Sequence, residues 1–160
     1  MNVQVEPDGP SARRMEVTDL ADVHIVEQDA YEFPWSIGVF KDCLRVGYSC
    51  WVLQLDGRVE GYGIMSIAAG EAHVLNLCVR PRQQRRGLGE HMLRHLCRSA
   101  RDANASTTFL EVRPSNGVAI RLYERHGFRR VGTRREYYPH PQGREDAYVY
   151  ALDLTRTDWM

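Results

Sequence analysis

Residues 76–89 read NLCVRPRQQRRGLG, and this stretch decides the fold prediction. A strand-like run ends at Val79, a basic turn with two glycines follows, and a helix-like run begins at Gly89. Glycines let the backbone approach a ligand closely, and adjacent N–H groups at the start of a helix attract anions. Arg82, Arg85 and Arg86 add positive charge at the same turn. The stretch therefore predicts a pyrophosphate site, with a solvated basic loop as the alternative.

Other phosphate-binding motifs fit this turn poorly. A P-loop requires Lys and then Ser or Thr after its second glycine, whereas Glu90 follows Gly89. A dinucleotide-binding fingerprint requires a third Gly or Ala, and Met92 occupies that position. The turn therefore belongs to neither of these classes.

The hydrophobic pattern on both sides of the turn predicts an alternation of strands and helices. Predicted strands cover 12–17, 49–55, 58–67, 72–79, 108–112, 129–137 and 146–152, and predicted helices begin at Thr18 or Asp19, at Ser36, at Gly89 and at Ser115. The resulting order is β-α-α-β-β-β-α-β-α-β-β. It indicates an α/β (α+β) fold with a mixed central sheet of about seven strands, flanked by about four helices.

Turn residues predict where several of these elements end. Asp56-Gly57 is a strong two-residue hairpin signal between two strand-like runs. Ser115 can cap a helix that stops at Gly127, where a left-handed residue is expected. A loop over Pro139–Gly143 divides the last two predicted strands.

The length and composition fit one compact domain. The chain has 160 residues, 43% of them hydrophobic and 26% charged, so it can bury a core. We predict a flexible N-terminal arm over residues 1–11, one domain over residues 12–154, and a short tail over residues 155–160.

The charge balance restricts the classes of partner. Twenty-one basic residues match twenty-one acidic residues, whereas general nucleic-acid binders are usually more basic. No apolar run approaches the roughly 20 residues that cross a bilayer, and residues 1–10 lack the pattern of a signal peptide. We therefore expect a cytoplasmic protein that contacts neither nucleic acid nor membrane directly, with a monomer favoured.

Cysteine and histidine spacing gives little support for a metal site. The cysteines, which form no C-x-x-C pair, are Cys43, Cys50, Cys78 and Cys97. Buried unpaired thiols are the favoured interpretation, and a nucleophilic Cys78 is a minor alternative. His91 and His95 have a spacing that can hold zinc, but no third ligand follows at a diagnostic interval. We expect no metal.

The glycine turn resembles the Q/R-x-x-G-x-G/A signature of the GCN5-related N-acetyltransferases, and Gln84, Gly87 and Gly89 occupy its defining positions. The predicted element order is similar to that of the same family's fold. The resemblance implies acetyl-CoA as co-substrate. It implies main-chain contacts to pantetheine from Leu77, Cys78 and Val79, with one N–H polarising the thioester carbonyl. It also implies a phosphate-binding turn made of Arg85, Arg86, Gly87, Leu88, Gly89 and Glu90.

Amine acylation also requires a group that accepts a proton and a group that donates one. Glu111 in a predicted strand and Tyr123 on the inner face of the next helix are the candidates. From the pattern alone, Glu111 would be an ordinary strand residue and Tyr123 an ordinary core aromatic.

Three further segments resemble one branch of the family, the ribosomal-protein-alanine N-acetyltransferases (RimI type). They are residues 33–36, residues 110–128, and residues 137–139 with 143–147, and the similarity extends over residues 12–154. The resemblance implies Glu111 as general base, Tyr123 as general acid, and Asn116 as a contact to pantetheine. It implies a peptide groove lined by Trp35, Tyr137 and Tyr138. It also implies that the substrate is the N-terminal amine of a ribosomal protein that begins with alanine.

Two alternatives stay open at this point. The first is an enzyme of the same fold that acetylates lysines or a small-molecule amine. The second is a CoA-binding module without catalysis, which would be expected to lack the acid and the base. The ordinary pKa of an α-amino group is about 7.7–8.0 and that of lysine is about 10.4, so one carboxylate deprotonates the N-terminal amine more easily.

Overall fold

The computed structural model describes residues 9–84 and 86–159. Residues 1–8 of the expected N-terminal arm and Arg85 of the glycine turn lie outside the described residues. Strand β1 (Ser11–Arg14) begins at the residue where the expected arm ends.

The predicted element order is confirmed. After β1 come α1 (Leu20–Ala30), α2 (Ile37–Arg45), β2 (Ser49–Leu55), β3 (Arg58–Ala68), β4 (Glu71–Val79), α3 (Leu88–Asp102), β5 (Thr107–Val112), α4 (Gly117–Arg125), β6 (Arg129–His140) and β7 (Gly143–Asp153). Two short 3-10 helices, Val17–Asp19 and Pro81–Gln83, add to these. The strands form one seven-stranded mixed sheet in the order β1-β2-β3-β4-β5-β7-β6, as the predicted fold class requires.

The chain divides into two compact units. The first contains Met1–Ile64 and Asn76–His95, and the second contains Met65–Leu75 and Leu96–Met160. Strands β3 and β4 and helix α3 contribute residues to both units.

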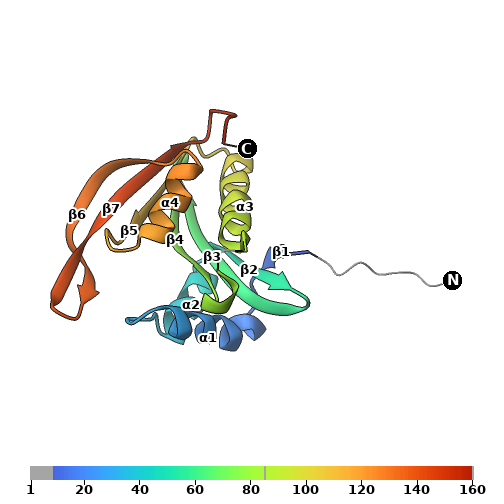
Figure 1. Cartoon of the computed structure of the whole chain (residues 1–160). Helices are drawn as coiled ribbons and strands as arrows, with labels where there is room; N and C mark the ends of the chain where they lie inside the picture. The colour runs from blue at the N-terminus through green and yellow to red at the C-terminus, as the bar shows by residue number, and fades with distance from the viewer. Residues whose placement is uncertain (1–8, 85, 160) are drawn as a thin grey trace. The chain divides into compact units, whose positions relative to one another are not determined.

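In the first unit, α1 and α2 pack against each other, as Figure 1 shows at the blue end of the chain. Their shared core contains Phe40, whose ring meets the edge of the Tyr62 ring at 5.3 Å. The hairpin between β2 and β3 turns at Asp56 and Gly57, with φ angles of 52° and 77°. Two positive φ values in a row are typical of the predicted two-residue turn, which is thereby confirmed.

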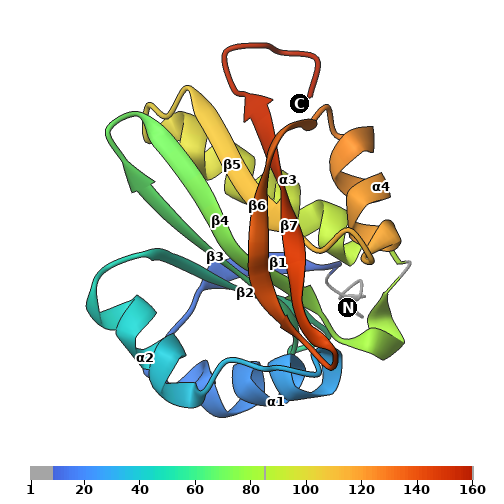
Figure 2. The same ribbon diagram turned by 90° about the vertical axis from the view of Figure 1, so that its left-hand side faces the viewer.

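In the second unit, β5 lies between β4 and β7. Residues Glu71–Val74 of β4 pair in parallel with Thr107–Leu110, whereas β7 pairs with β5 in the antiparallel sense. Figure 2 shows β6 and β7 side by side as a long hairpin. Helix α4 ends before Gly127, whose φ of 92° confirms the predicted left-handed stop.

Two predicted boundaries in the second unit are wrong. Helix α4 is capped by Asn116, whose side-chain oxygen accepts the Ala119 N–H at 3.2 Å, and not by Ser115. The Ser115 hydroxyl donates instead to Glu145 at 3.0 Å. The predicted loop over Pro139–Gly143 is shorter than expected, because β6 continues to His140 and β7 begins at Gly143. Strand β6 is at the sheet edge, where proline is tolerated in a strand.

The first predicted strand is also too long. It was expected to reach Val17, but β1 ends at Arg14 and Val17 begins a 3-10 helix. The Asp19 carboxylate explains the early turn, because it accepts the Glu16 N–H at 2.7 Å and forms two hydrogen bonds with the Arg13 guanidinium.

Candidate active site

The glycine turn has the backbone expected of an anion site. The 3-10 helix after Arg80 leads to Gly87, whose φ is 77°, and α3 starts at the next residue. Among the described residues other than its chain neighbours, none has a heavy atom within 4 Å of where a Gly87 Cβ would stand. The first turn of a helix presents N–H groups that have no acceptor within the helix. The described part of the turn therefore fits a diphosphate.

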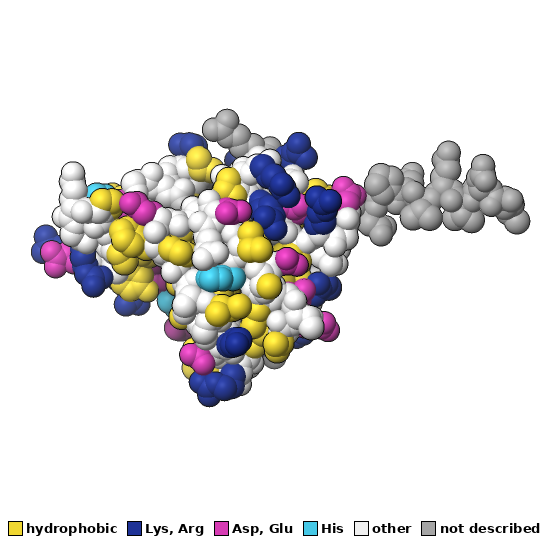
Figure 3. All heavy atoms as spheres, turned by 90° about the horizontal axis from the view of Figure 1, so that it is seen from below, with side chains coloured by type: hydrophobic (Ala, Val, Ile, Leu, Met, Phe, Trp, Pro, Cys, Tyr) yellow, Lys and Arg dark blue, Asp and Glu magenta, His cyan; other side chains and the backbone are white. Residues whose placement is uncertain are grey.

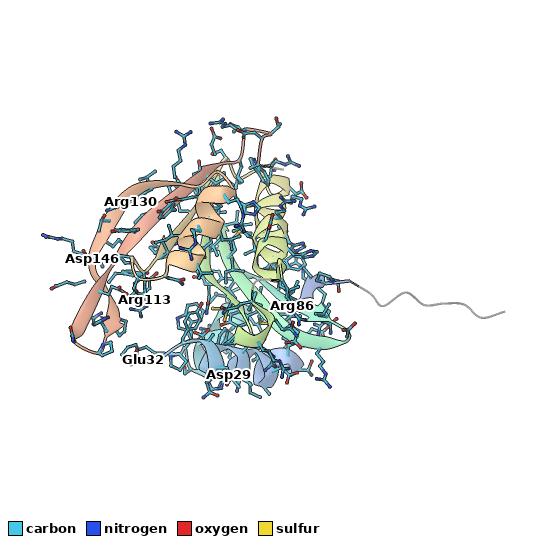
Figure 4. The ribbon with its side chains drawn as sticks, in the orientation of Figure 1. Asp29, Glu32, Arg86, Arg113, Arg130 and Asp146 are labelled. Carbon is cyan, nitrogen blue, oxygen red and sulfur yellow. The ribbon has the colours of Figure 1, made fainter. Side chains whose placement is uncertain are left out.

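The basic residues of the turn differ in their partners. Arg82 lies 3.7 Å from the Glu60 carboxylate, so part of its charge is balanced within the first unit. Arg86, labelled in Figure 4, is exposed. In the first turn of α3, the Glu90 carboxylate pairs with Arg94 at 3.0 Å. Arg86 thus adds exposed positive charge to the described part of the turn, and Glu60 balances part of the charge of Arg82.

Strand β4 carries the residues expected to contact pantetheine. The Leu77 carbonyl accepts the Tyr31 hydroxyl at 3.2 Å, and the Val79 carbonyl accepts the Gln84 side-chain amide at 3.3 Å. The Cys78 side chain is buried, and burial raises the pKa of its thiol to about 12. Cys78 is therefore a neutral thiol at neutral pH, which disfavours the alternative of a nucleophile.

A buried carboxylate organises the first unit beside Leu77–Val79. Glu27 on α1 is 2% exposed. Its Oε1 accepts the Trp35 N–H at 3.1 Å, and its Oε2 accepts the Asn76 side-chain amide at 3.0 Å and the Tyr62 hydroxyl. One carboxylate thus joins α1, the loop between α1 and α2, β3 and β4.

Replacing Glu27 with alanine should lower the free energy of unfolding by about 3 kcal/mol, because one buried and two partly buried donors lose their acceptor. Urea denaturation of both variants measures the effect. Gln28→Ala is the matched control, since Gln28 is the exposed neighbour on the same helix. Equal denaturation midpoints for the two variants would contradict a structural role for the Glu27 carboxylate.

Glu111 lies in β5 of the second unit with two basic partners. Its side chain is 6% exposed. Oε1 is 3.0 Å from Nε of Arg134, and Oε2 contacts Nε2 of His73. A buried carboxylate with positive and titratable partners is typical of a functional site.

One tyrosine, Tyr138, interacts electrostatically with this carboxylate, and Tyr123 interacts with Tyr138. Tyr123 on α4 is buried, and its ring centroid lies 5.8 Å from that of Phe128. Burial, and next the Glu111 carboxylate, raise the pKa of Tyr138 above its usual range, with Tyr137 and Tyr123 adding to the effect. Tyr138 is therefore within electrostatic reach of both predicted catalytic residues, Glu111 and Tyr123.

A backbone irregularity in β6 positions Tyr137 and Tyr138. The pairing with β7 shifts between Arg134 and Tyr138, and Glu136 has a φ of 50° with its N–H donating to Asp146 at 2.9 Å. The two rings then meet edge to face at 4.9 Å. Figure 4 labels Asp146 on β7 and Arg113, whose guanidinium lies 4.4 Å from the centre of the Tyr138 ring.

The loop between α1 and α2 exposes apolar side chains in the first unit. Trp35 is half-buried against Phe40 at 5.4 Å, while Phe33 and Ile37 are 43% and 37% exposed. Figure 3 shows hydrophobic side chains at the surface between charged ones on the face seen from below. An exposed apolar loop of this kind is suited to contact a peptide.

Neither a metal centre nor a membrane span is visible in the described residues. No group of three His, Cys, Asp or Glu side chains among them could hold an ion. His95 instead packs against the Trp51 ring at 4.2 Å. Within the same described residues, every helix is too short or too polar to span a bilayer. All four cysteines are buried and unbridged, as predicted.

The sequence prediction missed three residues that contact the predicted ones. They are His73 and Arg134, both on Glu111, and Glu27, which holds the Trp35 backbone. The sequence pattern gives no signal for His73, because only the pairing of β4 with β5 places it opposite Phe109, two residues before Glu111. It gives none for Arg134 either, because the irregularity in β6 sets its position.

Comparison with known proteins identifies the family. Residues 15–128 match the acetyltransferase (GNAT) family. The chain is 39% identical over 141 residues to ribosomal protein bS18-alanine N-acetyltransferase of Escherichia coli K12, covering 88% of this chain and 95% of that protein. The crystal structure of the ribosomal-protein-S18-alanine N-acetyltransferase from Escherichia coli has a TM-score of 0.86 at 37% identity, with 92% of this chain and 96% of that chain covered.

The chain therefore belongs to the GNAT family of acetyltransferases, and it is an acetyl-CoA-dependent N-acetyltransferase. The resemblance to the ribosomal-protein-alanine branch is confirmed by the same relatives. The fold is shared more widely. Arabidopsis thaliana Naa50 in complex with the bisubstrate analogue CoA-Ac-MVNAL has a TM-score of 0.80 at 19% identity, covering 91% of this chain and 99% of that chain.

Proposed function

We propose that this enzyme acetylates the N-terminal amine of a protein, an alanine-starting ribosomal protein, with Glu111 as general base and Tyr123 as general acid. The observation that carries the proposal is the buried Glu111 carboxylate, with Tyr138 in its electrostatic neighbourhood and Tyr123 in that of Tyr138. The relatives that are 39% identical over nearly their whole length act, by their name, on alanine of ribosomal protein bS18.

The transfer is direct, with no acyl-enzyme. Glu111 accepts the proton that the attacking amine loses as the N–C bond forms, and Tyr123 donates its phenolic proton to the sulfur as the C–S bond breaks. Acetyl-CoA supplies the acetyl group in activated form, as a thioester. The buried Cys78 thiol takes no part as a nucleophile, since burial keeps it protonated.

The positive φ of Gly87 and the start of α3 support a CoA site in the first unit. In our proposal the diphosphate is held by residues 85–90, and pantetheine by the main chain of Leu77, Cys78 and Val79. Asn116, in the second unit, uses its side-chain oxygen to cap α4. Its amide nitrogen can still donate, which supports its proposed contact to pantetheine.

For the peptide, we propose contacts from Trp35 in the first unit and from Tyr137 and Tyr138 in the second. The exposed apolar residues around Trp35 support the first contact. The 44% exposure of Tyr137 supports the second.

A panel of amines tests the proposed substrate class. Peptides beginning with Ala, Ser or Met are compared with polyamines and with an acetyl-capped lysine peptide, and products are located by mass spectrometry. We expect kcat/KM for the alanine peptide to exceed that for the capped lysine peptide by at least about 100-fold. The difference of about 2.5 pKa units between the two amines corresponds to about 3.5 kcal/mol of deprotonation free energy. Turnover of the capped lysine peptide alone would overturn the N-terminal assignment.

A further inference from the structure

We propose that His73 is a proton-relay residue for Glu111: it takes from the Glu111 carboxyl the proton given up by the attacking amine and passes it to water. This inference rests on the proposed function, because it takes Glu111 as the base. It concerns a residue on β4 that the sequence pattern did not single out.

The geometry places the imidazole on one oxygen of the carboxylate. His73 and Phe109 are paired across β4 and β5, and Glu111 follows two residues further along β5 on the same face. His73 Nε2 contacts Glu111 Oε2, while Nε of Arg134 lies 3.0 Å from Oε1. The two oxygens of the base therefore have different partners.

Burial separates the two ends of the relay. The Glu111 side chain is 6% exposed, whereas the His73 side chain is 31% exposed. A proton on the carboxyl has little direct contact with water, but an imidazolium at His73 can lose its proton to solvent. The imidazole thus connects a buried base with the surface.

The other charged and titratable groups near Glu111 or Tyr138 are unsuited to this step. Arg134 and Arg113 are guanidinium groups, which do not lose a proton in proteins. The Tyr138 hydroxyl keeps its proton, because burial and the Glu111 carboxylate raise its pKa. The Tyr137 ring packs against the Tyr138 ring. The Glu145 carboxylate already accepts hydrogen bonds from Arg113 and Ser115. Imidazole is the side chain that gains and loses a proton near neutral pH.

The proton balance closes at each step. The amine gives one proton to Glu111 Oε2, and the carboxyl gives it to Nε2 of a neutral His73. The resulting imidazolium releases one proton from Nδ1 to water, and a change of tautomer restores the starting state. No bond other than N–H and O–H bonds changes, and no additional reactant is required.

The decisive variant is His73→Gln, because its side-chain amide can occupy the position of Nε2 and donate to Glu111 but cannot carry a proton onward. We expect kcat to fall by about 10- to 100-fold and the pH profile of kcat to change shape. His24→Gln, on α1 of the first unit, is the matched control and should retain kcat. For His73→Ala, added imidazole should restore kcat in a concentration-dependent manner.

The possible results separate this inference from the proposed function. Full kcat and an unchanged pH profile in His73→Gln, with Glu111→Gln inactive, would overturn the relay and keep Glu111 as base. The relay would also be overturned if His73→Gln keeps the activity that His73→Ala loses and imidazole does not restore His73→Ala. A positioning role of the side chain at residue 73 would then suffice. Full activity of Glu111→Gln would overturn both. Circular dichroism of each variant verifies that the fold is intact.

Discussion

Glu111→Gln should lower kcat by about 10²–10⁴, because the amide has the shape of the carboxylate but cannot accept the proton of the amine. The effect should appear at saturating peptide and acetyl-CoA. The affinity for CoA, measured by titration calorimetry, should change little, since the glycine turn and Leu77–Val79 are untouched. The loss in kcat is therefore expected without a loss of cofactor binding.

A control is needed because Glu111 is also a structural ion-pair partner. Glutamine can keep one acceptor for Arg134, which lies 3.0 Å from Oε1 in the native chain. Arg134→Gln removes the partner but keeps the base, so it should retain far more activity than Glu111→Gln. Equal losses in the two variants would show that the ion pair, and not proton acceptance, accounts for the effect of Glu111.

Several element boundaries were predictable because each has a local signal. Asp56-Gly57 adopts the two positive φ angles that its sequence indicates, and Gly127 ends α4 as expected. The errors occur where a distant side chain competes with a local one. Ser115 has the right chemistry for a cap, but Glu145 from β7 accepts its hydroxyl and Asn116 takes its place.

The candidate site residues were predicted from the family resemblance and not from a local signal. Glu111 and Tyr123 were identified by resemblance, and the structure places Tyr138 in the electrostatic neighbourhood of both. Their partners come from pairings that a one-dimensional pattern does not give. His73 reaches Glu111 through the parallel register of β4 and β5, and Arg134 reaches it from a strand whose register shifts after that residue. Such contacts depend on strand pairing and not on spacing along the chain.

Tyr123→Phe should lower kcat by about 10²–10³, whereas Tyr138→Phe should lower it less than about tenfold. Both changes remove one hydroxyl and keep a packed ring, so each is a control for the other. A general acid is most effective when its pKa lies near the working pH, and the pKa of Tyr138 is raised away from it by burial and by Glu111. Tyr138 is accordingly a poor acid, and its ring is better suited to contact the peptide. Tyr138→Ala should therefore raise the peptide KM more than it lowers kcat. If Tyr138→Phe proves the more damaging of the two phenylalanine variants in steady-state kinetics, the acid is Tyr138 and the assignment of Tyr123 is wrong.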